Sequence, residues 1–324
     1  MIRRMLLAAT ALAALTGSAL AQPNYPERPI TVVVPFSAGG STDTIGRLIA
    51  EPMTRQLGQQ VIVENVAGAG GTLGAGRVAR ADPDGYTLML HHIGLASSVG
   101  LYRKLPYDAA TAFAPIGLVT DVPMTIVARA DFPANSISEL LDAIRAQGDK
   151  ITLAHAGVGS VNHLCGLLFM QALGTKMTSV GYKGGGPAMT DLLGGQVDVT
   201  CDQTTNTTGH IRSGKIKAYA VTTKARLPSL PDLPTLDEAG LKGFEVTAWH
   251  ALYAPKGTPE PVLSKLVSAL QTALKDPKVI ERFADLGTDP VSQERATPAA
   301  LGQHLQAEIV KWKPIIQAAG EYAD

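Results

Sequence analysis

The feature that most constrains this chain is a regular alternation of short apolar strands and amphipathic helices. Ile30–Val34 is followed by a helical pattern over Thr42–Leu57, and the succession returns where Ile151–His155 precedes Val161–Leu173. Repeated βα units predict mostly parallel sheets with helices on their faces. We therefore expect an α/β protein.

The remaining segments indicate two such domains. We expect further strands at Val61–Glu64, Tyr86–Leu90, Ile116–Val119, Thr125–Ala128, Met177–Val180, Gln196–Cys201, Lys217–Val221 and Phe244–Ala254. We expect further helices at Thr72–Arg80, Ser136–Gln147, Pro187–Leu193, Thr205–Ser213, Glu260–Leu274, Pro277–Leu286 and Pro298–Ala319. The first domain would comprise residues 22–123 and 247–324, and the second residues 124–246. Two crossing segments would then form a hinge, with a ligand cleft at the carboxyl ends of the strands.

The N-terminus reads as a secretory signal peptide. Arg3 and Arg4 precede a short apolar stretch, and Ala19-Leu20-Ala21 is a small-residue cleavage site, so residues 1–21 would be removed. Removing the two arginines leaves 26 of the 28 basic residues against 28 acidic ones, a net charge of −2. A near-neutral exported chain lacks the basic surface that nucleic-acid binding requires. We expect a periplasmic protein that binds no nucleic acid.

Two cysteines remain in the mature chain, Cys165 and Cys201. They could pair in an oxidising compartment. They could also be two small buried residues in separate elements, which is the interpretation that we prefer. Their number and spacing indicate no metal site.

The stretch VPFSAGGSTDT, residues 34–44, joins the first strand to the first helix. It matches neither the P-loop nor the dinucleotide-binding pattern nor the nucleophile elbow. Gly39 and Gly40 would let a ligand approach the backbone, and free N–H groups at the helix start favour an anion. The alternative is plain capping of the helix by Ser41 or Thr42. Asp43 would either orient the loop or meet an amine of the ligand.

Similar polar or glycine-rich turns follow other strands. Ala69 and Gly70 belong to the turn NVAGAGG, and His155–His163 reads HAGVGSVNH. His91 and His92 follow another strand, where neighbouring side chains point to opposite faces, so one of them is expected to face the cleft. Tyr182–Gly186 reads YKGGG, in which the lysine is either a counter-charge or a solvated side chain. Each turn alone is ordinary, whereas several at strand ends favour a binding site.

No serine, histidine and aspartate constellation, carboxylate pair or metal cluster suggests catalysis in this sequence. We therefore expect a binding protein, not an enzyme, with no metal or other cofactor.

Several of these stretches together resemble one family. They are YPERPITVVVPFSAGGSTDTIGRLIA, QQVIVENVAGAGGTLGA, ADPDGYTL, LYRKLPYD, YKGGGPAMTDLLGGQVDV and LPTLDEAGLKGFE. The chain resembles the Bug/TctC family of periplasmic solute-binding proteins that serve tripartite tricarboxylate transporters. The resemblance covers essentially the whole mature chain. It implies a two-lobed, type II periplasmic-binding-protein fold that closes over a small organic acid.

The resemblance also implies a set of ligand-binding residues. It maps the carboxylate-holding loop to Phe36, Ser37, Ala38, Gly39, Gly40, Ser41, Thr42 and Asp43. It maps the opposing lobe to Val158, Gly159, Ser160, Asn162, His163, Tyr182, Lys183, Gly184 and Asp202, and we add Ala69, Gly70, His91 and His92 from the turns. This loop lacks the proline that many relatives carry at Ser37 or Ala38, so the ligand cannot be inherited from the family.

The leading hypothesis is a receptor that delivers a small carboxylate to the membrane permease subunits of such a transporter. An exported sensor feeding a signalling system is the first alternative, and an exported hydrolase the second. We expect the protein to be a monomer.

Overall fold

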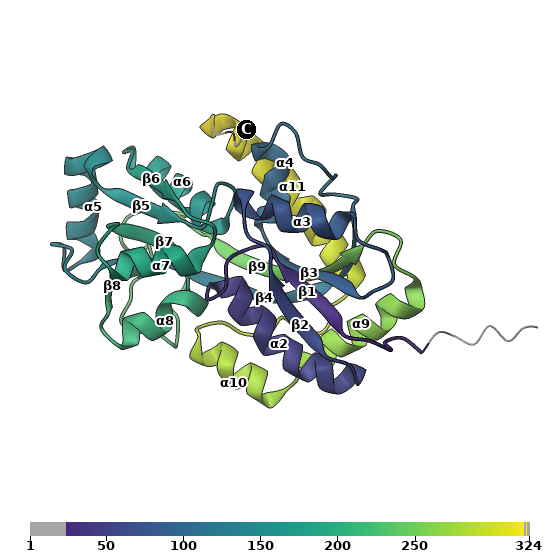
Figure 1. Cartoon of the computed structure of the whole chain (residues 1–324). Helices are drawn as coiled ribbons and strands as arrows, with labels where there is room; N and C mark the ends of the chain where they lie inside the picture. Colours follow the sequence, from purple (N-terminus) through teal and green to yellow (C-terminus); the bar gives the residue numbers. More distant parts are fainter. Residues whose placement is uncertain (1–23, 321, 323–324) are drawn as a thin grey trace, which may run out of the picture.

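The computed structural model describes residues 24–320 and 322 and shows a two-lobed α/β protein (Figure 1). The predicted signal peptide lies outside the described residues. The strands are β1 (Ile30–Val34), β2 (Val61–Asn65), β3 (Thr87–His92), β4 (Phe113–Arg129), β5 (Thr152–His155), β6 (Thr178–Gly181), β7 (Val199–Gln203), β8 (Ile216–Val221) and β9 (Thr247–Pro255).

The strands form two groups that share β4. In the first lobe the order is β2-β1-β3-β9-β4, and in the second it is β4-β7-β5-β6 with β8 also paired to β4. β1 pairs in parallel with β2 and β3, and β5 pairs in parallel with β6 and β7. The pairs made by β4 and β9 are antiparallel. The predicted two-lobed fold is confirmed, with parallel βα units in each lobe and antiparallel strands where the chain crosses between them.

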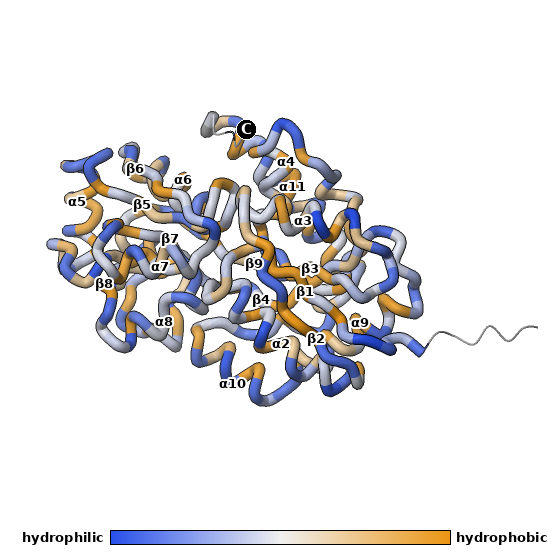
Figure 2. Tube along the Cα trace, in the orientation of Figure 1, coloured by the Kyte–Doolittle hydropathy of each residue, from blue (hydrophilic) through white to orange (hydrophobic). Residues whose placement is uncertain are grey.

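Helices cover both groups of strands. They are α2 (Ser41–Leu57), α3 (Thr72–Ala79), α4 (Gly94–Leu101), α5 (Ile137–Gln147), α6 (Val161–Leu173), α7 (Gly185–Leu193), α8 (Thr204–Arg212), α9 (Glu260–Ala273), α10 (Pro277–Asp285) and α11 (Pro298–Ala319), with 3₁₀ turns η2 (Ala69–Gly71) and η3 (Gly148–Lys150). In the first lobe α2 packs on β1, β2 and β3, whereas α11 packs on α4 and β4. In Figure 2 hydrophobic stretches follow β1, β3 and β9, as expected for strands buried on both faces.

Two elements differ from the sequence-based expectation. Helix α4 was not predicted, because its residues 94–98 are all buried and give no amphipathic period. The two strands expected at Ile116–Val119 and Thr125–Ala128 are one strand, β4, whose length of 17 residues lets it belong to both lobes. Tertiary pairing on both sides maintains this extended segment.

β4 changes its pairing partner between Pro123, which pairs with β9, and Met124, which pairs with β7. The second crossing precedes β9, where the Val246 amide donates to the Thr222 carbonyl at 3.2 Å. Both crossings therefore fall close to the predicted boundaries. The domain limits themselves, 22–123 with 247–324 and 124–246, stay a prediction.

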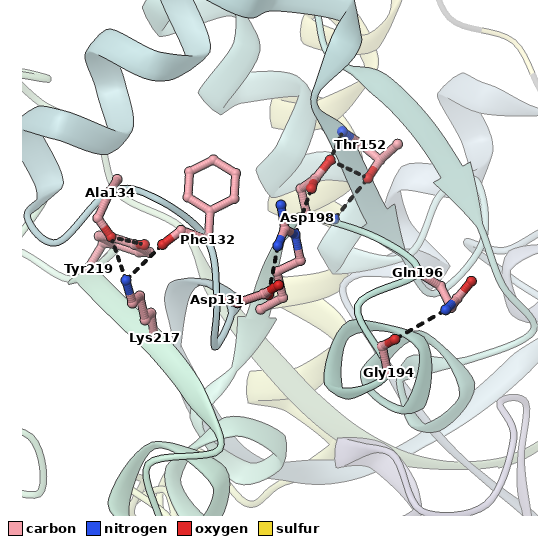
Figure 3. A network of polar contacts seen from close by, with 10 residues as sticks. Asp131, Phe132, Ala134, Thr152, Gly194, Gln196, Asp198, Lys217 and Tyr219 are labelled. Carbon is pink, nitrogen blue, oxygen red and sulfur yellow. Dashed lines mark hydrogen bonds and ion pairs between the residues drawn. The ribbon is translucent and has the colours of Figure 1, made fainter.

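A polar network holds strand ends together in the second lobe (Figure 3). Asp198 accepts hydrogen bonds from the Thr152 amide and hydroxyl and from Arg129 Nε. Lys217 Nζ donates to the carbonyl of Phe132 at 2.7 Å. These bonds join the end of β4 to the start of β5 and to the residue before β7, and they connect the segment after β4 to β8.

The cysteines correct one expectation. Cys165 on α6 and Cys201 on β7 form a disulfide, so the preferred interpretation of two separate thiols is wrong. Sequence spacing could not reveal this, because the two residues become neighbours only when α6 packs on β7. Within residues 24–320, no helix combines the length and apolar character that a membrane-spanning segment needs.

Candidate functional site

The junction between β1 and α2 presents unpaired backbone donors. Gly40 is the N-cap residue in an extended conformation, and no side chain caps the helix. The alternative that Ser41 or Thr42 caps α2 is therefore wrong, since both lie in its first turn and are buried. The first N–H groups of a helix have no partner within the helix, and they carry the positive end of its dipole. The Ser41 hydroxyl is also buried without a hydrogen-bond partner among the described residues.

Asp43 orients this loop. Its carboxylate accepts a hydrogen bond from the Gly39 amide at 3.0 Å, from Asn65 Nδ2 at 3.0 Å and from Arg47 Nε at 3.1 Å. Burial raises the pKa of Asp43, but the bonds from Arg47, Gly39 and Asn65 outweigh burial and hold this pKa below its usual value. Of the two roles left open by the sequence, the structure shows loop orientation.

Three helices of the second lobe begin opposite this junction. Ser160 caps α6 by accepting from the His163 amide, α7 begins at Gly185, and α8 follows directly after Gln203. An alanine Cβ placed on Gly40 would lie 3.3 Å from the Gly186 amide nitrogen. The N-termini of α2 and α7 therefore face each other at close range across the two lobes.

Between them lies a narrow cavity of about 10 Å³, which corresponds to room for about one water. Its walls come from both lobes and consist of Phe36, Gly40, Ser41, Thr42, His92, Ala156, Asn162, Gly185, Asp202 and Gln203. Seven of these residues were predicted as ligand contacts, and Ala156, Gly185 and Gln203 were not. Whether they contact a ligand stays a prediction.

Buried histidines back the cavity from the first lobe. His92 stacks on Phe36 with ring centroids 4.5 Å apart, and it contacts His250 edge-on at 5.7 Å. Burial, followed by the neighbouring histidines, lowers the pKa of His92 well below its ordinary value. His92 Nδ1 accepts from the Gly94 amide at 2.9 Å, so the neutral ring carries its proton on Nε2. His92 is therefore a neutral donor in the wall, whereas its neighbour His91 packs behind Phe36.

His250 was missed by the sequence analysis. It lies in β9 opposite His92, and its Nε2 is 3.2 Å from the Thr42 hydroxyl. No local motif marks it, because it reaches the site only through strand pairing. It lies 158 residues beyond His92 in the chain, so the sequence pattern gives no sign that the two histidines are in contact.

Asp202 is the charged group of the cavity wall. It is 2% exposed, and its carboxylate accepts from Asn162 Nδ2 and the Gln203 amide, each at 2.7 Å, and from Asn206 Nδ2. Burial raises the pKa of Asp202 to about 6, although these hydrogen bonds act to lower it. The group is therefore mostly ionised at neutral pH.

The other predicted residues lie at the rim or behind the wall. Ser37, Ala69, Gly70, Val158, Tyr182 and Lys183 line an open cavity of about 800 Å³, and Ala38 and Gly39 line one of about 580 Å³. Gly184 packs against Ser37, Gly159 accepts a hydrogen bond from Ser97, and Ser160 and His163 occupy the first turn region of α6.

The rim residues hold the lobes against each other. The Ser37 amide and hydroxyl lie 3.1 and 3.0 Å from the Lys183 carbonyl, to which they donate. The Tyr102 hydroxyl, which was not predicted, is 2.7 Å from the Ala69 carbonyl and 3.2 Å from that of Val158. The cleft is thus closed by contacts to backbone groups.

A further cavity of about 440 Å³ lies between α6 and α11 and has mainly apolar walls. Its one lysine or arginine is the exposed Lys176, and the start of α6 that borders it is capped by Ser160. The chemistry for holding an anion is therefore concentrated at the α2 cavity.

Comparison with known proteins agrees with this geometry. Residues 45–321 match the model of the TctC family, described as tripartite tricarboxylate transporter family receptor. The chain belongs to the TctC family. Among curated relatives of this TctC protein, BugT of Bordetella pertussis is 36% identical over 298 residues, which cover 91% of this chain and 90% of BugT.

Solved structures of the same kind superpose closely on the TctC chain. The periplasmic binding protein BugD has a TM-score of 0.90 and 53% identity, covering 92% of this chain and 99% of BugD. MatC of Rhodopseudomonas palustris, solved with bound malate, has a TM-score of 0.87 and 44% identity, covering 90% of this chain and all of MatC. The family and these neighbours are solute-binding proteins.

Proposed function

We propose that this chain is a periplasmic receptor that captures a small carboxylate between its lobes and delivers it to a tripartite tricarboxylate transporter. One observation carries the proposal: the N-termini of α2 and α7 face each other across a cavity that also contains the buried, unpartnered Ser41 hydroxyl. Helix N-termini and backbone amides favour anions. Binding of malate by the relative MatC supports a small dicarboxylate as the ligand class.

The cavity lining contains no lysine or arginine, so hydrogen bonds must hold the carboxylate. A well-formed charge-assisted hydrogen bond contributes about 1.5–3 kcal/mol. Two or three such bonds supply about 3–9 kcal/mol, and a micromolar Kd corresponds to about 8 kcal/mol, so nearly the full set has to form for tight binding. The ligand thus needs contacts from both lobes, and it would stabilise the closed form.

Calorimetry of the mature protein, freed of co-purified ligand, tests the binding step. We expect binding of at least one acid in a panel of mono-, di- and tricarboxylates, aromatic acids and acidic amino acids, and no binding of neutral sugars. Recovery of the bound acid unchanged would exclude turnover. Binding of sugars alone would sink the proposal.

Gly40→Val links binding to the cavity. A Cβ there already lies 3.3 Å from Gly186 N, so the larger side chain fills the space between α2 and α7 and should abolish binding. Gly209→Val is the matched control, because an added Cβ on that exposed glycine of α8 meets no atom within 4 Å. Unchanged affinity in Gly40→Val, with the fold intact, would move the site elsewhere.

Delivery is tested separately by uptake of the labelled acid into cells that express the permease subunits, with and without this receptor. We expect uptake to require the receptor. Uptake that is independent of the receptor, together with tight binding, would favour the sensor alternative.

A further inference from the structure

The two sides of the cavity differ in hydrogen-bonding character. The first turn of α2 offers backbone amides and the Ser41 hydroxyl, which are donors to an anion. The second lobe offers the Asp202 carboxylate, which has no lysine or arginine beside it in the cavity lining. A ligand carboxylate placed against Asp202 would meet like charge.

Gln203 adds a second acceptor. Its side chain is 3% exposed and lines the cavity, and its Oε1 has no hydrogen-bond partner among the described residues. An unpartnered buried acceptor is costly, so buried polar groups normally find a partner. A donor that enters the cavity would give this oxygen a partner.

The Thr42 hydroxyl is a third acceptor, because its hydrogen bond to His250 fixes the direction in which its proton points. His250 Nδ1 lies 3.1 Å from the Ala248 carbonyl, which can only accept, so Nδ1 carries the proton. Burial lowers the pKa of His250 to about 3, so the ring is neutral and its Nε2 is an acceptor. The Thr42 hydroxyl at 3.2 Å must then donate to Nε2, which leaves only lone pairs for the cavity.

We propose that this site selects carboxylates that carry a hydrogen-bond donor, either hydroxyl or ammonium, on the carbon beside a carboxylate, with Asp202 and Gln203 as the selecting acceptors. The donor has to be adjacent because the amides of α2 and these acceptors line the same narrow cavity. This inference rests on the proposed function and narrows its ligand class. A plain dicarboxylate would satisfy the α2 donors but leave the acceptors of the opposite wall without a partner.

Three four-carbon acids that differ only at C2 provide the test. Succinate, (S)-malate and (S)-aspartate are titrated at pH 7.5 into the ligand-free mature protein. We expect malate or aspartate to bind at least about tenfold more tightly than succinate, a factor equivalent to about 1.4 kcal/mol. The tighter of the two identifies the donor as hydroxyl or ammonium. Mandelate and phenylacetate make the same comparison for aromatic acids.

Asp202→Asn tests the residue itself. We expect the preference for the donor-bearing acid, measured as a ratio of Kd values, to fall to about threefold or less, because an amide is a weaker acceptor than a carboxylate. Asp142→Asn is the control, since this exposed carboxylate lies on α5, outside the lining of the α2 cavity and of both rim cavities, and should leave the ratio unchanged. Gln203→Leu removes the second acceptor and should reduce the ratio even if Asp202→Asn fails to fold.

The outcomes separate the two proposals. The inference is overturned if succinate binds as tightly as malate and aspartate, or more tightly, and phenylacetate as tightly as mandelate, or more tightly. The proposed receptor function would still stand. An undiminished preference in folded Asp202→Asn and Gln203→Leu removes these residues from selection. Absence of binding by every acid in the larger panel defeats the proposed function itself.

Discussion

Removing the Cys165–Cys201 disulfide gives a perturbation whose magnitude follows from the structure. The bridge closes a loop with a sequence separation of 36 residues. The chain-entropy relation assigns such a loop about 13 cal/mol/K, or about 4 kcal/mol at 25 °C. With an unfolding entropy of about 2.1 cal/mol/K per residue over about 300 residues, the loss corresponds to a fall of about 6 °C in Tm.

The assay is urea unfolding of the mature protein, with and without reductant, beside the double variant Cys165→Ala with Cys201→Ala. We expect the double variant to lose about 4 kcal/mol of unfolding free energy. Reduced wild type should approach the same value. The double variant in reductant is the control, because it has no bridge to lose.

Two results would refute this reasoning. Thiol counting under denaturing, non-reducing conditions that finds two free thiols would exclude the bridge. If the urea midpoint of the wild type is the same with and without reductant, and both thiols are shown to be free in reductant, the loop constraint contributes little to stability.

The remaining predictions concern closure, acid stability and loop orientation. Gly70→Ala should weaken ligand binding at least about tenfold, the equivalent of one lost charge-assisted bond, because the added Cβ would lie 1.9 Å from the Val158 carbonyl of the other lobe. The control is Gly174→Ala, since Gly174 has a similar positive φ with open space around it. Equal losses of affinity in the two variants, measured by calorimetry, would contradict a defect in closure. Burial lowers the pKa of His91 from 6.5 to about 4, so as the pH falls this histidine is protonated in the unfolded chain before it is protonated in the folded one. The unfolding free energy should therefore fall below pH 6.5, by about 3 kcal/mol at pH 4 from this group alone. Urea midpoints that do not change over this pH range would disprove it. Asp43→Ala should lower the unfolding free energy by about 1–3 kcal/mol and weaken binding, whereas an unchanged ligand affinity would show that the loop holds its shape without this carboxylate.

Much of the fold was predictable because it depends on local periodicity. The strand Ile30–Val34 and the helix Val161–Leu173 occur with the expected limits. Helix α4 escaped prediction because its residues 94–98 are all buried, and the continuity of β4 because its middle is extended only through pairing in both lobes. These elements depend on the rest of the protein for their conformation.

The same distinction applies to the candidate site. The glycine turns at Gly40 and the helix starts near Asn162 are visible in the sequence, since turn residues and caps are local signals. His250 is not, because it belongs to no turn motif and reaches Thr42 only through the assembled sheets.

By itself, the sequence determined an α/β chain with glycine turns before helices, because strand alternation, helix periodicity and turn chemistry act over a few residues. Only the tertiary structure decided that Asp43 orients its own loop, that Cys165 and Cys201 are bonded, and that Asp202 faces the α2 N-terminus across a closed cavity. These facts depend on distances between residues far apart in the chain, which packing of the two lobes sets and local pattern does not encode.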